Sequence, residues 1–337
     1  MTTAAPVHVG DRLNVSPLGF GGMALTPVYG DVDQNEALRT LHHAVDAGVT
    51  FIDTADIYGG GSNEELIARL LKERRDEVQL ATKYGLVGTP SAGYTDIRGD
   101  RAHVRQAVEA SLRRLGTETI DLYYMHRRDL RVPMVETVEA MAELVQQGKV
   151  RHLGLSEVTA EELREASSVH PIAAVQSEWS IWSRDVERNV VPAAAGLGVG
   201  FVPYSPLGRG FLTGTVDASQ LGSDDFRRKI PRFAESAADA NRGVVAAVQA
   251  VAAEHSVAGL PATPAQVALA WLLAQGTRLG LPVVPIPGTR KAERIDENLG
   301  ALALNFTPAQ LEKLDAAADA VVGSRSADPN WVSQGRE

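Results

Sequence analysis

The segment from Thr50 to Lys83 reads TFIDTADIYGGGSNEELIARLLKERRDEVQLATK. It opens with a short apolar stretch that ends at Asp53, and a glycine-rich turn follows. From the Ser62 or Asn63 cap onward, apolar residues such as Leu66 and Leu70 recur at helical spacing,. The next apolar stretch, 78–82, is short and flanked by polar residues, as a strand is. The segment therefore predicts a strand, a helix and a second strand in succession.

The same unit recurs along most of the chain. Strands are predicted at 18–20, 50–53, 78–82, 120–124, 150–155, 172–176, 200–204 and 281–285,. Helices are predicted at 36–45, 62–70, 104–115, 135–148, 160–168, 186–197, 240–254, 264–274, 295–299 and 308–320,. Eight strand–helix units with mostly apolar strands favour a closed parallel (β/α)8 TIM barrel over an open sheet.

Three further segments complete the predicted architecture. Residues 7–9 and 13–15 flank Gly10-Asp11 and predict an N-terminal β-hairpin cap,. Residues 210–234 exceed the usual loop length, so we expect extended loops at the C-terminal mouth of the barrel. Residues 323–337 are predicted to form an irregular tail. With no long linker in the sequence, residues 1–337 are interpreted as a single barrel domain.

Composition narrows the function. The formal net charge is -9 and the basic runs are short, which argues against a nucleic-acid partner,. The chain has no cysteine, which excludes a disulfide, a zinc thiolate and a cysteine nucleophile, and we expect no metal,. Neither a signal peptide nor a stretch long enough to span a membrane is visible, so we expect a cytoplasmic protein without a membrane partner. The oligomeric state is not determined by the sequence.

The glycines of this chain do not follow the dinucleotide-binding fingerprint. Gly19-Phe20-Gly21-Gly22 resembles its beginning, but no helix opens directly after it,. Gly196, Gly198 and Gly200 precede a strand, which is the wrong order. A nicotinamide cofactor would therefore have to bind through another part of the chain.

Polar side chains stand at the carboxyl ends of successive predicted strands, where a barrel places its active site. Asp53 ends the second strand and Tyr58 lies in the following loop, whereas Lys83 and His126 end the third and fourth strands. Tyrosine is a weak acid, and a nearby cation would ease the release of its proton. We expect Asp53 to hold Lys83 in its charged form and His126 to orient a substrate oxygen.

Six motifs make the chain resemble the aldo-keto reductase family over residues 12–320. They are FIDTADIYG (51–59), ATK (81–83), DLYYMHR (121–127), GKVRHLGLS (148–156), FVPYSPLGRG (201–210) and IPGTRKAERIDEN (286–298). The chain resembles most the bacterial and plant branch that includes pyridoxal and perakine reductases. The resemblance implies an oxidoreductase that transfers a hydride from NADPH to an aldehyde or ketone and gives an alcohol.

The resemblance also implies roles for individual residues. Tyr58 would be the general acid, tuned by Lys83 and Asp53, and His126 would position the carbonyl. Ser156 and Gln176 would hold the nicotinamide carboxamide, and Tyr204 would stack on its ring. The pyrophosphate loop would comprise Ser205, Leu207, Gly208, Arg209 and Gly210. The adenosine end would comprise Thr289, Arg290, Arg294, Glu297 and Asn298, with Arg294 on the 2′-phosphate.

Two positions depart from the family's pattern. Glu157 stands where asparagine is frequent, and an ionised carboxylate cannot donate to the carboxamide oxygen, although it can accept from the amide nitrogen,. Gly288 stands where many members have lysine, which removes one phosphate-binding cation. Arg290, Lys291 and Arg294 would compensate, and the choice between NADP and NAD stays open.

Substrate residues are chosen by position and aromatic character: Met23, Tyr29, Trp179, Trp182 and Trp331. They favour an aromatic or ring-shaped carbonyl substrate. Two alternatives remain: Lys83 forming a Schiff base in a barrel aldolase, or a cofactor-binding regulatory subunit resembling those of potassium channels. For residues 210–234 we expect a lid that closes over NADP, or else a surface loop without coupling to the cofactor.

Overall fold

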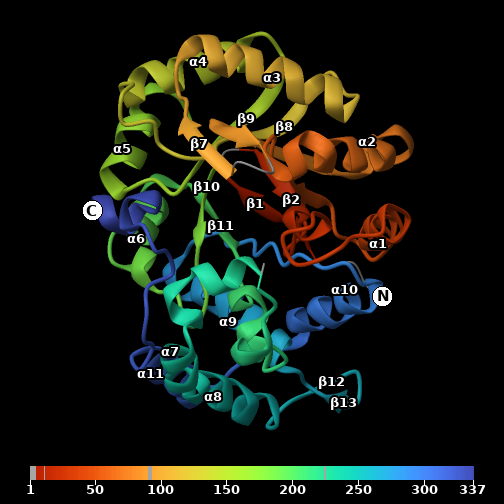
Figure 1. Ribbon diagram of the computed structural model, residues 1–337, viewed down its shortest axis with the longest axis vertical. Coiled ribbons are helices and arrows are strands. Elements are labelled where there is room, and N and C mark those ends of the chain that lie inside the picture. Colours follow the sequence, from red (N-terminus) through yellow and green to blue (C-terminus); the bar gives the residue numbers. More distant parts are fainter. Residues whose placement is uncertain (1–4, 11, 90–92, 224) are drawn as a thin grey trace.

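The computed structural model describes residues 5–10, 12–89, 93–223 and 225–337. Its central sheet has seven parallel strands in the order β11-β10-β9-β8-β5-β4-β3. These are β3 (Phe20–Gly21), β4 (Phe51–Asp53), β5 (Gln79–Tyr84), β8 (Ile120–Met125), β9 (Val150–Ser156), β10 (Ala174–Glu178) and β11 (Gly200–Tyr204). The helices surround this sheet (Figure 1).

Residues 282–287 close the barrel between the first and last strands of the sheet. Phe201 donates its backbone N–H to the Pro282 carbonyl, and Ile286 donates to the Pro203 carbonyl. On the opposite side, Gly19 donates to the Pro285 carbonyl at 2.9 Å. The closing segment itself contains three prolines, at 282, 285 and 287, which have no N–H to give, so a regular ladder cannot form,. The (β/α)8 barrel is therefore confirmed, with an eighth position that is extended but irregular.

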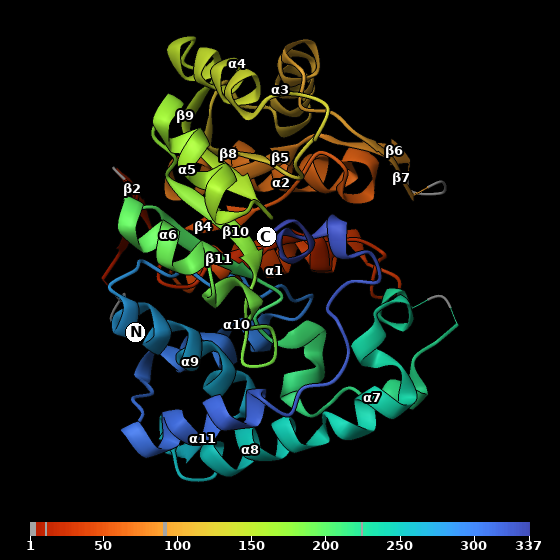
Figure 2. The same ribbon diagram turned by 90° about the vertical axis from the view of Figure 1, so that its left-hand side faces the viewer.

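Eight helices follow the strands around the outside (Figures 1 and 2). They are α1 (Gln34–Asp46), α2 (Ser62–Arg74), α3 (Arg101–Leu115), α4 (Met134–Gln146), α5 (Ala160–Val169), α6 (Val190–Leu197), α9 (Pro264–Leu279) and α10 (Ala292–Leu299). Local sequence fixes several starts: Thr159 with Glu162, and Thr263 with Gln266, form capping boxes,. The helix predicted at 186–197 begins only at Val190, because residues 185–187 form a separate 3₁₀ turn.

Three helices lie outside this ring: α7 (Glu235–Ala240), α8 (Arg242–Ala252) and α11 (Pro308–Ala318). The helix predicted at 240–254 is α8, which begins only at Arg242. Asn241, whose buried side-chain amide donates to the Val322 carbonyl, separates it from the unpredicted short helix α7. Helix α8 packs against α11, as both views show (Figures 1 and 2). The predicted helices at both places are confirmed with these shifted bounds.

The N-terminal hairpin of β1 (Val7–Val9) and β2 (Leu13–Val15) lies at the bottom of the barrel. Its apolar side chains pack with Phe51, Leu122 and Tyr124 from the strands. The predicted hairpin cap is thus confirmed on its described residues; Asp11 of the predicted turn lies outside them.

The opposite, C-terminal end of the strands is covered by three segments. One is a hairpin that the sequence analysis did not predict, β6 (Leu86–Thr89) with β7 (Gly93–Ile97). The second is the long insertion, which contains 3₁₀ turns between residues 208 and 233. The third is the tail, which also contains only 3₁₀ turns after residue 323 but buries Arg325 and Ser333. A further unpredicted hairpin joins β12 (Ser256–Val257) and β13 (Leu260–Pro261) near α8. Within the described residues, no helix combines the length and apolarity needed to cross a bilayer.

Candidate active site

The barrel mouth brings Asp53, Tyr58, Lys83 and His126 together. Lys83 has no exposed surface, and its ammonium binds the Asp53 carboxylate and the Thr54 carbonyl, the latter at 2.8 Å. The Lys83 nitrogen lies 5.1 Å from the centre of the Tyr58 ring. The Tyr58 ring meets the His126 ring edge to face, with centroids 5.9 Å apart. The four side chains thus form one continuous cluster.

Burial determines the charge state of this cluster. Burial, together with the positive charges of Arg127 and Lys83, holds the pKa of His126 well below its ordinary value, so the imidazole is neutral,. Burial lowers the pKa of Lys83 and raises the pKa of Asp53, and the ion pair between them opposes both shifts. A neutral imidazole can donate a hydrogen bond to a carbonyl oxygen without competing as a proton source.

The pKa of Tyr58 differs from the expectation. Burial and then the negative charge of Asp53 raise this pKa well above its ordinary value, whereas a lowered one was expected from Lys83. The nearby cation that does lower it is Arg127. Tyr58 therefore keeps its proton at neutral pH, and Lys83 is engaged by Asp53.

The residues expected around the nicotinamide adjoin this cluster. Gln176 donates to the second Asp53 oxygen at 2.9 Å, and the Ser156 hydroxyl accepts from Arg127 at 3.3 Å. Both side chains are buried beside the tetrad. Tyr204 ends β11, and its hydroxyl donates to Glu157 at 2.7 Å.

Glu157 was expected beside the nicotinamide carboxamide, but its carboxylate is bound by the C-terminal tail. Its carboxylate forms a two-point ion pair with Arg325, at 2.8 and 3.0 Å, and also accepts from the Ser333 backbone. Although burial alone would raise it, Arg325 holds the pKa of Glu157 well below its usual range. Glu157 is therefore a buried anion that fastens the C-terminal tail to the mouth, with its oxygens already occupied.

The loop after β11 has the backbone of an anion cradle. Ser205, Gly208, Arg209 and Gly210 all have positive φ angles, between 49° and 92°. Successive residues of this kind can point backbone N–H groups into one concave site that suits phosphates. Gly208 is required here, since a Cβ would lie 2.6 Å from the Trp182 indole nitrogen. The Gly208 and Gly210 N–H groups donate within the loop, to the Ser205 and Leu207 carbonyls at 2.9 and 3.0 Å. The positive-φ backbone is therefore the feature that makes this loop a candidate site for the pyrophosphate of a dinucleotide.

The adenosine end separates two arginines that the sequence analysis treated alike. Arg290 donates to the backbone carbonyls of Tyr29, Gly30 and Asp31 at 2.7–3.1 Å, so it is occupied in holding that loop. Arg294 is exposed on α10; its backbone N–H donates to the Lys291 carbonyl at 3.2 Å, but its guanidinium has no hydrogen bond or ion pair with the described residues. Thr289 is buried and accepts from the Lys291 N–H.

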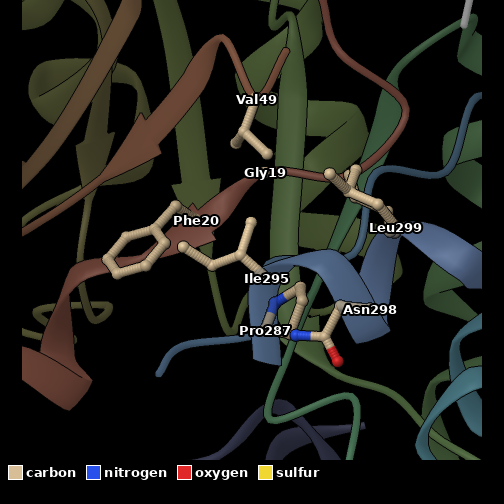
Figure 3. A pocket seen from close by; sticks show the side chains of 8 residues that line it. Gly19, Phe20, Val49, Pro287, Ile295, Asn298 and Leu299 are labelled. Carbon is tan, nitrogen blue, oxygen red and sulfur yellow. The ribbon is translucent and has the colours of Figure 1, made fainter. Parts of the chain in front are cut away.

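A cavity of about 10 Å³ lies between β3 and α10, bordered by Phe20, Val49, Ile295 and Asn298 (Figure 3). Its size is that of one water molecule, so it is no ligand site. Asn298 is buried beside it, and Glu297 offers its backbone carbonyl to Gln266 at 2.9 Å. Gly288 approaches the first strand closely, because a Cβ there would lie 2.4 Å from the Gly21 carbonyl. A lysine could not replace it without movement of the backbone.

Two of the three tryptophans expected to contact substrate, Trp179 and Trp182, lie away from the mouth. Trp179 is fully buried among Phe201 and Trp271, and its indole N–H binds Glu187. Trp182 stacks on Phe211 beneath the insertion, with centroids 4.6 Å apart. Both expectations are therefore corrected: these are packing residues, since aromatic side chains at a strand end pack against the helix layer as readily as they face the mouth.

Other side chains do lie at the mouth. Trp331, in the tail, stacks on Tyr94 of the β6–β7 hairpin and covers the Arg127 guanidinium. Met23 and Tyr29 are partly exposed in the loops after β3. Sequence analysis missed Tyr94 and Arg127; the signal for Arg127 was its position directly after His126. Within the described residues, no group of three or more His, Cys, Asp or Glu side chains could hold a metal ion.

These features define a (β/α)8 oxidoreductase barrel, and comparison with known proteins agrees. The model of the Aldo/keto reductase family matches residues 17–319. A probable aldo-keto reductase 1 from Glycine max is 43% identical over 314 residues, 92% of this chain and 87% of that protein. The chain belongs to the aldo-keto reductase family and is an oxidoreductase of small carbonyl compounds; such enzymes generally use nicotinamide cofactors.

Solved structures are similar throughout. The glycerol dehydrogenase AKR11B4 from Gluconobacter oxydans is 28% identical, with a TM-score of 0.83 over 97% of this chain and 99% of that one. The holo form of the aldo-keto reductase AKR11C1 from Bacillus halodurans is 26% identical, with a TM-score of 0.75 over 96% of this chain and 99% of that one.

Proposed function

We propose that this protein is an NADPH-dependent reductase of aldehydes or ketones in which Tyr58 is the general acid. The observation that supports this most directly is the contact of Tyr58 with both the buried Lys83–Asp53 pair and His126. When bound, the dinucleotide would supply the hydride that reaches the carbonyl carbon. The proton for the carbonyl oxygen must then come from the protein.

The protein's own residues would act in sequence on that oxygen. The neutral His126 imidazole and the Tyr58 hydroxyl orient it by hydrogen bonds. Tyr58 then gives up its proton as negative charge develops on the oxygen, so that an alcohol and a phenolate form. Lys83, 5.1 Å from the ring centre, and Arg127, whose charge lowers the pKa of Tyr58, are the cations that would stabilise this phenolate until solvent returns the proton,. The reverse direction uses the same groups, and one structural neighbour is described as a glycerol dehydrogenase.

Cofactor binding would use both ends of the mouth. We propose Ser156 and Gln176 for the carboxamide, Tyr204 for the ring, the loop 205–210 for the pyrophosphate, and Arg294 with Lys291 for the 2′-phosphate. Support for NADP over NAD comes from Arg294, an exposed guanidinium without a partner among the described residues, because its planar fork suits a phosphate,. We also propose a cytoplasmic location.

The two alternatives fit the structure less well. A Schiff-base lysine must reach its substrate, whereas Lys83 is fully buried and paired with Asp53,. A regulatory subunit would bind NADPH yet turn over slowly, so turnover with a panel of aldehydes separates it from a reductase.

The decisive experiment is Tyr58→Phe. We expect carbonyl reduction to fall roughly 10²–10⁴-fold, the usual contribution of a general acid, with NADPH binding unchanged. The control is Tyr84→Phe, which removes a hydroxyl that is buried without a hydrogen-bond partner in the core. If Tyr58→Phe reduced a slow ketone at near wild-type rate, Tyr58 would not be the acid.

A further inference from the structure

Arg127 is a buried cation whose charge acts on Tyr58 and His126, but whose hydrogen-bonding capacity the reaction described above leaves unused. It follows His126 directly after β8 and is only 8% exposed. Its Nη1 donates to the His126 carbonyl at 2.7 Å and to the Ser156 hydroxyl at 3.3 Å. The opposite edge of the guanidinium, formed by Nε and Nη2, makes no hydrogen bond to any described residue, and Nε is buried.

The neighbouring buried cations have carboxylate partners. Lys83 is paired with Asp53, and Arg325 with Glu157. Arg209 lies 3.1 Å from Glu178. Across the described parts of the chain, Arg127 has no such ion pair. A buried charge without a directly paired counter-charge is unfavourable, because the two hydrogen bonds of Nη1 and the Trp331 ring replace only part of the water that it has lost,.

Arg127 also lies at the end of a flat aromatic surface. The Trp331 ring is centred 5.1 Å from its guanidinium carbon, and the Tyr94 ring stacks on Trp331 at 5.3 Å. Beyond these rings an open groove of about 470 Å³ runs between the β6–β7 hairpin, residues 128–131 and the tail. The arginines that line this groove are occupied; Arg131, for example, binds Asp129 and Asp96. Arg127 itself does not line the groove, but it contacts the groove residue Trp331 on one side and follows His126 of the tetrad on the other.

We propose that Arg127 determines substrate specificity by binding a carboxylate carried by the carbonyl substrate. A carboxylate is planar and accepts two parallel hydrogen bonds, which matches the edge formed by Nε and Nη2. The substrate class is then an oxo acid or a formyl-substituted aromatic acid, its flat portion against Trp331 and Tyr94. Since Arg127 adjoins His126, the carboxylate fixes the carbonyl between His126 and Tyr58. This rests on the proposed reductase function.

The experiment compares matched acids and esters. The 2-, 3- and 4-carboxybenzaldehydes and their methyl esters are tested with NADPH, and the ratio of kcat/KM for acid over ester is measured. We expect the best isomer to give a ratio of roughly ten to one hundred, the range for a charge-assisted pair. Arg127→Gln should reduce this ratio at least tenfold. Arg131→Gln, which removes a groove cation already paired with Asp129, should leave the ratio unchanged.

Each result bears on the proposal. A wild-type ratio near one overturns it, and so does a ratio that survives Arg127→Gln or an equal loss for acid and ester, since a structural role would affect both alike. If Arg127→Gln does not fold, Arg127→Lys is used; it keeps the charge without the planar fork, and an intermediate ratio is expected.

Binding separates this proposal from the reductase function. Calorimetry measures carboxybenzyl alcohols and their methyl esters on the NADP⁺-loaded protein. If no carbonyl is turned over but the acid still binds more tightly than the ester, and only with Arg127 present, the reductase function fails and the carboxylate site stands. If acid and ester bind equally, the carboxylate site is wrong whatever the turnover.

Discussion

Two arginines at the proposed adenosine end differ in whether their guanidinium groups can bind a phosphate of the cofactor. Arg290 is occupied by three backbone carbonyls, whereas Arg294 is exposed without a partner in the described chain. We expect Arg294→Ala to weaken NADPH binding roughly tenfold or more and to leave NADH almost unchanged, because a charge-assisted bond contributes about 1.5–3 kcal/mol. Titration of both cofactors measures this.

Arg290→Ala is the matched control for that prediction. It should weaken both cofactors alike, since it releases the loop at residues 29–31 and touches no proposed phosphate group. Equal losses of NADPH and NADH in Arg294→Ala would instead mean that Arg294 supports α10.

Asp56 lies between the tetrad and α2 and makes stability depend on pH. Burial, and then the negative charge of Glu64, raise the pKa of Asp56 to about 8, and one of its oxygens has no hydrogen-bond partner among the described residues. In the unfolded chain the group ionises near 3.8. The folded form therefore binds the proton more tightly, so its contribution is complete below about pH 4 and is lost as pH rises towards 8.

Asp56→Asn should therefore stabilise the protein in alkaline solution. The gain grows by at most about 1.4 kcal/mol per pH unit between the two pKa values. We expect thermal melts at about pH 4 to differ little between variant and wild type, and melts at about pH 8.5 to favour the variant. A constant difference across this range would show that Asp56 does not titrate there.

At the scale of elements, ion pairs fasten the tail to the barrel, and the most deeply buried of those between described residues joins Glu157 to Arg325. Glu157, at the end of β9, and Arg325 are 168 residues apart, and both side chains are almost fully buried. Arg325→Ala should cost about 3–5 kcal/mol in urea denaturation, because it leaves the Glu157 carboxylate buried without its partner. The tail should also become a site of rapid proteolysis.

A double-mutant cycle tests whether the pair itself is responsible. Glu157→Gln with Arg325→Ala should cost less than the sum of the single changes, since no buried charge then remains at position 157. Additive costs would show that the two side chains contribute independently and that the tail is held elsewhere.

The insertion at 210–234 stays a predicted lid. Phe211 and Phe233 of the insertion pack against Trp182. Arg227 of the insertion donates to the Arg209 carbonyl and lies 5.5 Å from the Tyr29 ring centre. These contacts place the insertion against the loop that Arg290 holds. We expect NADP to slow hydrogen exchange in the described residues 210–223 and 225–234. Unchanged exchange would leave an uncoupled surface loop.

At the scale of the whole molecule, the barrel closes through its least regular segment. Residues 282–287 bond to β11 on one side and to the first strand on the other, although their prolines interrupt the ladder,. The backbone of Gly288 lies close to the Gly21 carbonyl of the first strand, which completes the closure. Closure matters for the site because Thr289 and α10, which follow immediately, complete the same mouth as the tetrad.

The sequence by itself predicted the barrel, most helices and the convergence of Asp53, Tyr58, Lys83 and His126 at one mouth. Helices and strands could be predicted because apolar periodicity is a property of neighbouring residues in the sequence. The site residues could be predicted because a parallel barrel brings the carboxyl ends of all its strands to one mouth. Tertiary structure decided the rest. Trp179 and Trp182 pack in the interior, Arg290 holds a loop, and Glu157 binds Arg325. In each case the partner that fixes the side chain is distant in the sequence. The local sequence pattern does not show which distant groups will pack against a side chain, form hydrogen bonds with it or neutralise its charge.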